Sequence, residues 1–179
     1  MNRRPARLAI PRRRRRRSRR LDGLRILMPQ CETRYFATVS YDDQTVITFP
    51  AGLPAFEHCR RFLPVQDAAR RPFIFLQSLE DARLCFLTVP VAALDPGYQL
   101  KMSPQDLATI GLQKPPAAGP DLQCLAVISF DRDGVASANL LAPIIVNAAT
   151  RLAVQAVRDD SVYHCSHPLT PAAEATPCS

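Results

Sequence analysis

Short runs in which apolar or aromatic residues occupy every second position recur through the sequence and restrict its fold more than any other feature. The first run spans 35–41, turn residues follow at 42–44, and a second run spans 45–49. A period of two is typical of a half-buried β-strand, and the turn residues allow the chain to reverse. These three segments therefore predict a β-hairpin. Two prolines and a glycine at 50–54 end the second strand.

The later runs predict more strands and one clear helix. Strand-like runs lie at 61–65, 73–79, 83–89, 98–102, 122–130, 135–145 and 152–157. Ser103 can cap a helix and Pro104 suits its first position, so a short helix is predicted over 104–110, ending at Gly111.

Strands that follow one another without repeated helices favour an antiparallel sheet over a parallel α/β fold. A chain of 179 residues with 47% apolar composition can bury one sizeable core and is too short for two ordinary domains. We therefore expect a mainly β, single-domain antiparallel architecture, either barrel-like or a sandwich, with one or two short helices. The domain is predicted to span 35–169, with a frayed C-terminus at 170–179.

The positive charge of the chain is concentrated at its N-terminus. Residues 1–27 hold 12 of the 23 Lys and Arg residues and one of the 16 acids, which leaves 11 basic and 15 acidic residues, a net charge of −4, in 28–179. Like charges at this density have no apolar face to bury, so residues 1–30 are predicted to be a disordered tail. Met28 offers a second start, so the tail is either a start-site extension or a basic arm that binds phosphates.

The other residue types give no signal for a catalytic, metal or cofactor site. Six cysteines show no C-x-x-C pair and no regular spacing, which argues against a zinc or disulfide framework and suits a reducing cytoplasm. His58 and His164 each precede a cysteine, but neighbouring side chains on a strand point to opposite faces and cannot form a catalytic pair. Apolar runs are all shorter than the roughly 18 residues of a membrane span. We expect a cytoplasmic protein without cofactor or metal and without enzymatic activity.

Three stretches of the sequence carry more specific information. The first, 49–57, reads F-P-A-G-L-P-A-F-E and is followed by Phe62. The second, 72–78, reads P-F-I-F-L-Q-S and is followed by Phe86. The third, 136–147, reads A-S-A-N-L-L-A-P-I-I-V-N. The residues that continue this pattern are Leu87, Thr150, Arg151, Gln155, Tyr163, His167, Pro168 and Leu169.

In this order and spacing, the three stretches resemble those of the FliW family of flagellar assembly factors over about 35–169, and order across such a length is far more specific than a single motif. The chain departs from the family pattern at Ala55 and Ala153, where glycine is usual, and at Ala149, where lysine is common. Alanine at the two glycine positions requires either a negative φ or room for a methyl group.

The resemblance implies a compact β-rich domain that binds newly made flagellin and, after flagellin export, binds the RNA-binding translational regulator CsrA instead. Apolar motif residues are expected in the core, whereas Gln77 and Asn139 either satisfy buried backbone groups or face a partner. Because an acidic body suits a basic partner, we expect carboxylates at the contact and no direct binding of nucleic acid by the body. The candidate partner-binding residues are Glu57, Gln77, Glu80, Asp81, Asn139, Asn147, Asp159 and Asp160.

Two other classes of function remain open at the level of sequence. One is an RNA-binding β-barrel protein that uses the basic N-terminal arm, in which case removal of residues 1–27 would abolish binding. The other is a small cysteine hydrolase, in which case replacement of the six cysteines by serine would abolish activity.

Overall fold

A computed structural model describes residues 28–114, 121–160 and 162–169. The predictions for a tail before Met28 and for a frayed end after Leu169 lie outside these residues. Ordered β structure begins at Gln30, five residues before the predicted domain start. No helix in the described ranges is long and apolar enough to cross a membrane.

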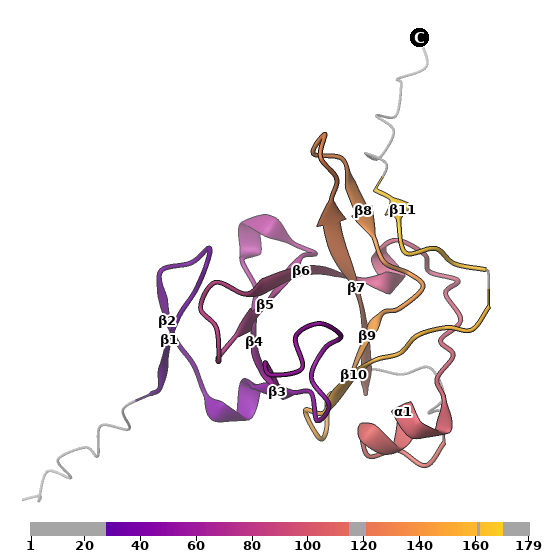
Figure 1. Cartoon of the computed structure of the whole chain (residues 1–179). Coiled ribbons are helices and arrows are strands. Elements are labelled where there is room, and N and C mark those ends of the chain that lie inside the picture. Colours follow the sequence, from indigo (N-terminus) through magenta and orange to yellow (C-terminus); the bar gives the residue numbers. More distant parts are fainter. Residues whose placement is uncertain (1–27, 115–120, 161, 170–179) are drawn as a thin grey trace, which may run out of the picture.

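Seven antiparallel strands follow one another around a ring, which Figure 1 shows nearly end-on. Their spatial order is β10 (Ala153–Gln155), β9 (Ile144–Asn147), β7 (Leu122–Phe130), β6 (Cys85–Pro90), β5 (Ile74–Ser78), β4 (Arg61–Val65) and β3 (Ile47–Thr48). A single parallel bridge between Thr48 and Leu152 joins the two ends of this path, and the Thr48 N–H donates to the Arg151 carbonyl at 2.9 Å. One bridge is not a ladder, so the sheet is barrel-like without being a closed barrel. The prediction of a mainly β, antiparallel fold is confirmed.

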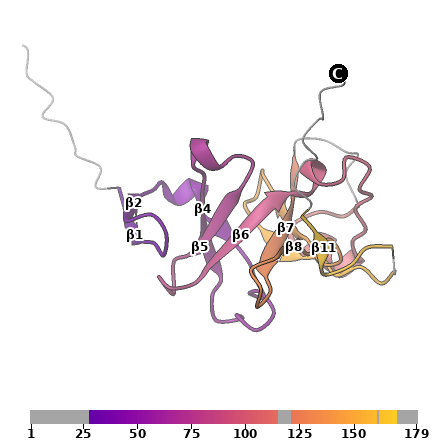
Figure 2. The ribbon, with the colours of Figure 1, turned by 90° about the horizontal axis from the view of Figure 1, so that it is seen from above.

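The segment between β3 and β4 covers one open end of the ring. It crosses the centre of the ring in Figure 1 and lies beyond the strands in Figure 2. Phe49, Leu53 and Cys59 of this segment are buried in the same apolar cluster as Phe62 and Leu76 of the ring. The rings of Phe49 and Phe62 meet edge to face with centroids 5.3 Å apart, a favoured aromatic geometry. The apolar motif residues of this stretch therefore complete the core.

A separate two-stranded sheet, β1 (Gln30–Glu32) and β2 (Thr38–Ser40), covers the outer face of the ring at β5. The ring of Phe36 packs edge to face on Phe75 at 4.8 Å, and the Arg34 N–H donates to Gln77 Oε1 at 3.0 Å. All five residues of β5 are consequently buried, although a strand in a ring has one outward face. This explains why the second motif stretch is apolar on both faces.

Outside the ring, helix α1 (Pro104–Thr109) lies against the region of β9 and β10, where Ile110 packs with Ile145. Ser103 and Asp106 form the complete capping box, and Gly111 has a φ of +79°, which ends the helix as predicted. The remaining elements are β8 (Ala136–Ala138), β11 (His167–Pro168) and the 3₁₀ turns η1 (Asp43–Thr45), η2 (Ala68–Arg70) and η3 (Val91–Ala93).

Three details of the predicted strands are wrong. The runs at 35–41 and 45–49 do not pair: β2 pairs with β1, and β3 pairs with β4. The reason is local, because the Asp42 carboxylate accepts the Gln44 N–H and opens the η1 turn, which directs the chain into the ring. Segment 98–102 forms no strand. Segment 135–145 breaks into β8 and β9, which pair with the two halves of β7.

The backbone at Gly52 and Ala55 is left-handed, with φ values of +74° and +68°. A Cβ on Gly52 would lie 2.5 Å from the Glu57 Cα, so this position excludes any side chain. Ala55 is exposed and keeps its methyl group at a cost of roughly 1–2 kcal/mol, because L-residues clash with their own backbone in this region. Ala153 is different, since it lies in β10 without a positive φ and its methyl group is buried in the core.

The buried guanidinium of Arg158 fastens the C-terminal segment to the loop after η3. It lies against the rings of both Tyr98 and Tyr163, 5.3 and 4.8 Å from their centroids, and the two rings also contact each other, with centroids 4.5 Å apart. It also donates two hydrogen bonds to the Asp160 carboxylate, at 3.0 and 2.8 Å, and one to the Gln99 carbonyl. Its charge is therefore both paired and hydrogen-bonded, as burial requires.

The two alanines that replace the family's glycines should respond oppositely to restoration of glycine. Ala55→Gly relieves the left-handed strain and should raise the free energy of unfolding by about 1 kcal/mol. Ala153→Gly removes a buried methyl group and loosens a strand, and should lower it by about 1–2 kcal/mol. Urea denaturation of both variants measures the two changes. Equal effects in the same direction would contradict the backbone conformation at Ala55.

Arg158→Lys should lower the free energy of unfolding by about 2–3 kcal/mol, although the charge is kept. Lysine cannot make the paired hydrogen bonds to Asp160, and it cannot place a planar guanidinium against the two tyrosine rings. The matched control is Arg132→Lys, at an exposed turn position, which should change stability by less than about 0.5 kcal/mol. Thermal unfolding followed by circular dichroism compares the two variants, and equal melting temperatures would exclude a fastening role for Arg158.

Candidate functional site

Residues of the first and third motif stretches, together with Phe86 after the second stretch, line one open hollow at the covered end of the ring. The hollow has a volume of about 230 Å³ and is lined by Leu53, Pro54, Phe56, Phe86, Val127, Ser129, Asn139, Gln155 and Cys165. Residues far apart in sequence thus form one surface, with the first stretch on one side and β6, β7 and β10 on the other. We take this hollow as the candidate functional site.

Aromatic rings that pack edge to face or tilted against one another form the floor of the hollow. Phe86 meets Phe56 edge to face with centroids 5.3 Å apart and meets Phe62 at 5.8 Å. Phe62 is fully buried, whereas Phe56 and Phe86 are half-buried and remain accessible from the hollow. The floor is therefore continuous with the core and rigid, and it leaves apolar surface exposed.

Two side-chain amides form a polar edge, and both are held by the same residue. The Ala142 N–H donates to Asn139 Oδ1 at 2.9 Å, and the Ala142 carbonyl accepts from Gln155 Nε2 at 3.0 Å. These bonds fix which end of each amide is oxygen and which is nitrogen. The other ends, Asn139 Nδ2 and Gln155 Oε1, form no hydrogen bond within the described ranges, and neither is a buried atom left without a partner.

Gln77 and Asn147, two further candidates from the sequence, lie inside the protein. Gln77 is 1% exposed, and its amide contacts Arg34 N–H and the carbonyls of the β5–β6 turn, among them Leu84 at 3.0 Å. Asn147 is 4% exposed and donates to the Ile110 carbonyl at 2.9 Å. Both satisfy buried backbone groups, so neither is available to a partner in this conformation and neither belongs to the proposed surface.

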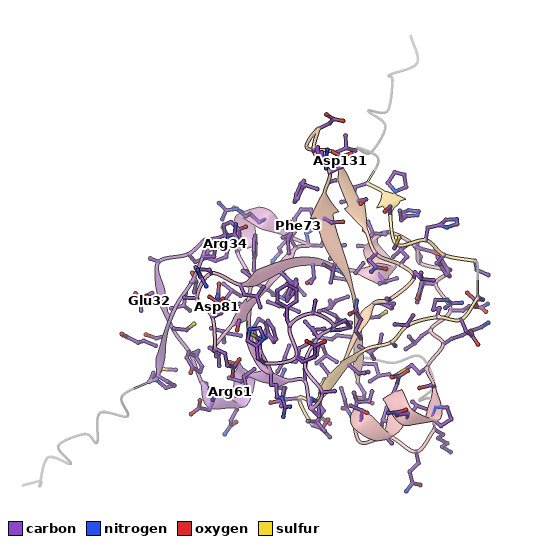
Figure 3. All side chains as sticks on the ribbon, viewed as in Figure 1. Glu32, Arg34, Arg61, Phe73, Asp81 and Asp131 are labelled. Atoms are coloured by element: carbon purple, nitrogen blue, oxygen red, sulfur yellow. The ribbon has the colours of Figure 1, made fainter. Side chains whose placement is uncertain are left out.

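The acidic candidates divide into paired and unpaired carboxylates. Glu80 pairs with Arg61 at 2.8 Å, and Asp81 pairs with Arg83 at 3.4 Å. Asp160 pairs with Arg158 at 2.8 Å and with Lys101 at 2.6 Å, and these hydrogen bonds hold its pKa below the ordinary value. Figure 3 labels Arg61 and Asp81 on the side of the molecule nearest β1 and β2, with Asp131 far away at the hairpin tip.

Glu57 and Asp159 are exposed, and neither forms an ion pair with a cation in the part of the chain that the structure describes. Glu57 follows Phe56 of the hollow, and its Oε1 accepts the Ala55 N–H at 3.0 Å. Hydrogen bonds from the backbone of Glu57 and Ala55 lower the pKa of its carboxyl group, so Glu57 is charged at neutral pH. Asp159 lies elsewhere, beside Arg158.

The cysteines are poorly suited to nucleophilic chemistry. Burial raises the pKa of the Cys85 thiol to about 11 and that of Cys124 to about 12, the reverse of what a reactive thiolate needs. Cys59 is fully buried, and only Cys165 is exposed among the cysteines in the described ranges. No cluster of three His, Cys, Asp or Glu side chains among these residues could hold a metal ion.

Sequence reasoning identified Asn139 as a candidate but missed the hollow itself. Phe56 and Phe86 were expected only in the core, although both also face the hollow. Cys165 carried no motif signal. No short window of the sequence carries a signal for the hollow, because its lining comes from segments that only the fold brings together.

Comparison with known proteins relates most of the chain to one family. A family model described as FliW protein matches residues 30–169. The flagellar assembly factor FliW of Natranaerobius thermophilus is 34% identical over 137 residues, covering 75% of this chain and 88% of the relative. FliW of Azoarcus sp. (strain BH72) is also 34% identical, over 135 residues that cover 70% and 88% of the two chains.

A crystal structure of the flagellar assembly factor FliW superimposes with a TM-score of 0.69 over 80% of this chain and 98% of the solved one. At 24% identity this similarity supports the fold alone. The family match begins at Gln30, where β1 begins, and ends at Leu169, just after β11. From the match over 30–169 and the relatives at 34% identity, the chain belongs to the FliW family of flagellar assembly factors.

Proposed function

We propose that this protein binds newly made flagellin in the cytoplasm and, when flagellin has been exported, binds a CsrA-type translational regulator instead. Binding of the regulator would relieve its repression of flagellin translation. Two ligands are then linked through one protein, whose free concentration reports flagellin export, and no covalent chemistry by this chain is required.

The observation that carries the proposal is that motif residues far apart in the sequence line one open hollow: the first stretch contributes Leu53, Pro54 and Phe56, the third contributes Asn139, and Phe86 follows the second. Motif residues needed only for the core would be fully buried, as Phe49 and Phe62 are. Phe56, Phe86 and Asn139 instead combine a structural contact with surface that a partner can reach. The hollow has an apolar floor and a polar edge, and protein–protein interfaces likewise have an apolar centre and a polar rim.

The charge of the described residues supports a basic protein partner. Eleven basic and 14 acidic residues lie in the described ranges, because Glu174 falls outside them, so their net charge is −3. A surface of this sign attracts a cationic protein and repels phosphates. Among the candidate carboxylates, Glu57 and Asp159 contribute most, since the others are neutralised by arginine or lysine.

The proposal predicts that residues 28–179 alone bind the CsrA-type regulator, with an affinity that falls as salt rises, and have no affinity for RNA. The reason is that screened attraction steers the acidic body towards a basic protein. Fluorescence titration into labelled regulator, labelled flagellin and labelled flagellin leader RNA, at low and high salt, measures the three affinities.

The full-length chain is the matched control for the N-terminal arm. RNA binding by the full chain that disappears in 28–179 would assign that binding to the Arg-rich arm and leave the partner proposal intact. Tight RNA binding by 28–179, with no binding to regulator or flagellin, would overturn the proposal even though the fold is that of the family.

A further inference from the structure

We propose that the hollow receives one large apolar side chain from a basic protein segment, while Glu57 faces a lysine or arginine of the same segment. This inference rests on the proposed function and names the surface through which the basic regulator is held. Size, hydrogen-bonding groups and charge each support this occupant.

The size of the hollow favours a side chain over a small molecule. Its volume of about 230 Å³ is below the about 300–1,000 Å³ that small-molecule sites usually have. Leu53, Phe56, Phe86 and Val127 give it an apolar floor. Binding energy in protein interfaces is concentrated at such places, where an aromatic or aliphatic anchor fills a preformed pocket.

The polar edge suits a peptide backbone beside the anchor. Asn139 Nδ2 is a donor and Gln155 Oε1 an acceptor with no hydrogen bond in the described ranges, and the backbone of Ala142 holds the other end of each amide. Both residues line the hollow, and a donor and an acceptor there can pair with the carbonyl and N–H of a peptide backbone. The two amides are thus already ordered before binding, which reduces the loss of side-chain entropy when a partner binds.

The charge beside the hollow selects a cationic segment. Glu57 is the residue after Phe56, is fixed by its hydrogen bond to the Ala55 N–H, and has no ion-pair partner in the described ranges. The cationic side chain hydrogen-bonded to Glu57 is that of Arg60, whose Nε donates to the Glu57 backbone carbonyl at 3.4 Å and not to the carboxylate. A second copy of this protein is a poorer occupant, because two acidic surfaces of this kind would repel each other.

Cys165 provides a probe at the edge of the hollow. It is exposed and lines the hollow, whereas burial raises the pKa of Cys31, Cys85 and Cys124 and slows their alkylation. The full chain is treated with iodoacetamide, with and without excess purified CsrA-type regulator, and modification is read at each cysteine by peptide mass spectrometry. We expect bound regulator to slow alkylation of Cys165 at least about tenfold, whereas an equal concentration of a protein that does not bind this chain should leave the rate unchanged.

A matched pair of variants tests the same surface by binding. Ser129→Arg places a bulky cation at the edge of the hollow, on an exposed strand position, and should weaken regulator binding at least about tenfold. Ser40→Arg makes the same change on an exposed position of β2 and should leave binding within about twofold. Glu57→Gln keeps the acceptor for Ala55 but removes the charge, and should slow association and reduce its salt dependence.

The outcomes separate this inference from the proposed function. If the wild-type chain binds the regulator, but Cys165 is not protected and Ser129→Arg binds normally, the hollow is not the contact and this inference is wrong. If the wild-type chain binds neither regulator nor flagellin, the proposed function is wrong, and this inference, which rests on it, is wrong as well. Protection of Cys165 that rises with the concentration of this protein alone would show that a second copy occupies the hollow and would also overturn the proposal. Circular dichroism of each variant confirms that it is folded.

Discussion

The structure depends on how the inward-facing side chains of a seven-stranded ring are covered where the ring is open. The segment from Phe49 to Cys59 supplies that cover, and it can do so only because the chain turns sharply at Gly52 against the backbone of Glu57. When this segment packs on the ring, Phe49 and Cys59 join the core, and Pro54 and Phe56 form one side of the hollow. Core and candidate site are therefore two faces of the same loop.

This arrangement explains why family motifs and partner contacts are hard to separate by inspection of a sequence. Gln77 and Asn147 are polar, lie in motif stretches and yet satisfy backbone groups inside the fold. Phe56 and Phe86 are apolar and yet remain partly accessible. In a small barrel-like domain, the side chains that anchor the loops lie close to the surface that a binding partner contacts.

Local signals in the sequence predicted the helix at Pro104 and the full extent of β7, because capping residues and long apolar runs act over a few positions. Strand pairing was predicted less well. The turn residues at 42–44 predict a hairpin over 35–49, but the Asp42 turn directs the chain away, and β2 pairs with the strand at Gln30 instead. The pairing of Glu80 with Arg61 follows from the packing of β4 on β5, which joins residues 19 apart and which no short window reveals, whereas Asp81 pairs with Arg83 within the β5–β6 turn.

The join between Thr48 and Leu152 gives the ring a seam. Every other neighbouring pair along the path is held by two or more registered residue pairs, whereas this join has one bridge, beside the left-handed Arg151. Hydrogen bonds that stand alone break without cooperative loss of their neighbours. Thermal fluctuation should therefore break the contact between Thr48 and Leu152 first and open the ring there, while β5, β6 and β7 keep their hydrogen bonds. A chain that needs to loosen without unfolding has a built-in place to do so.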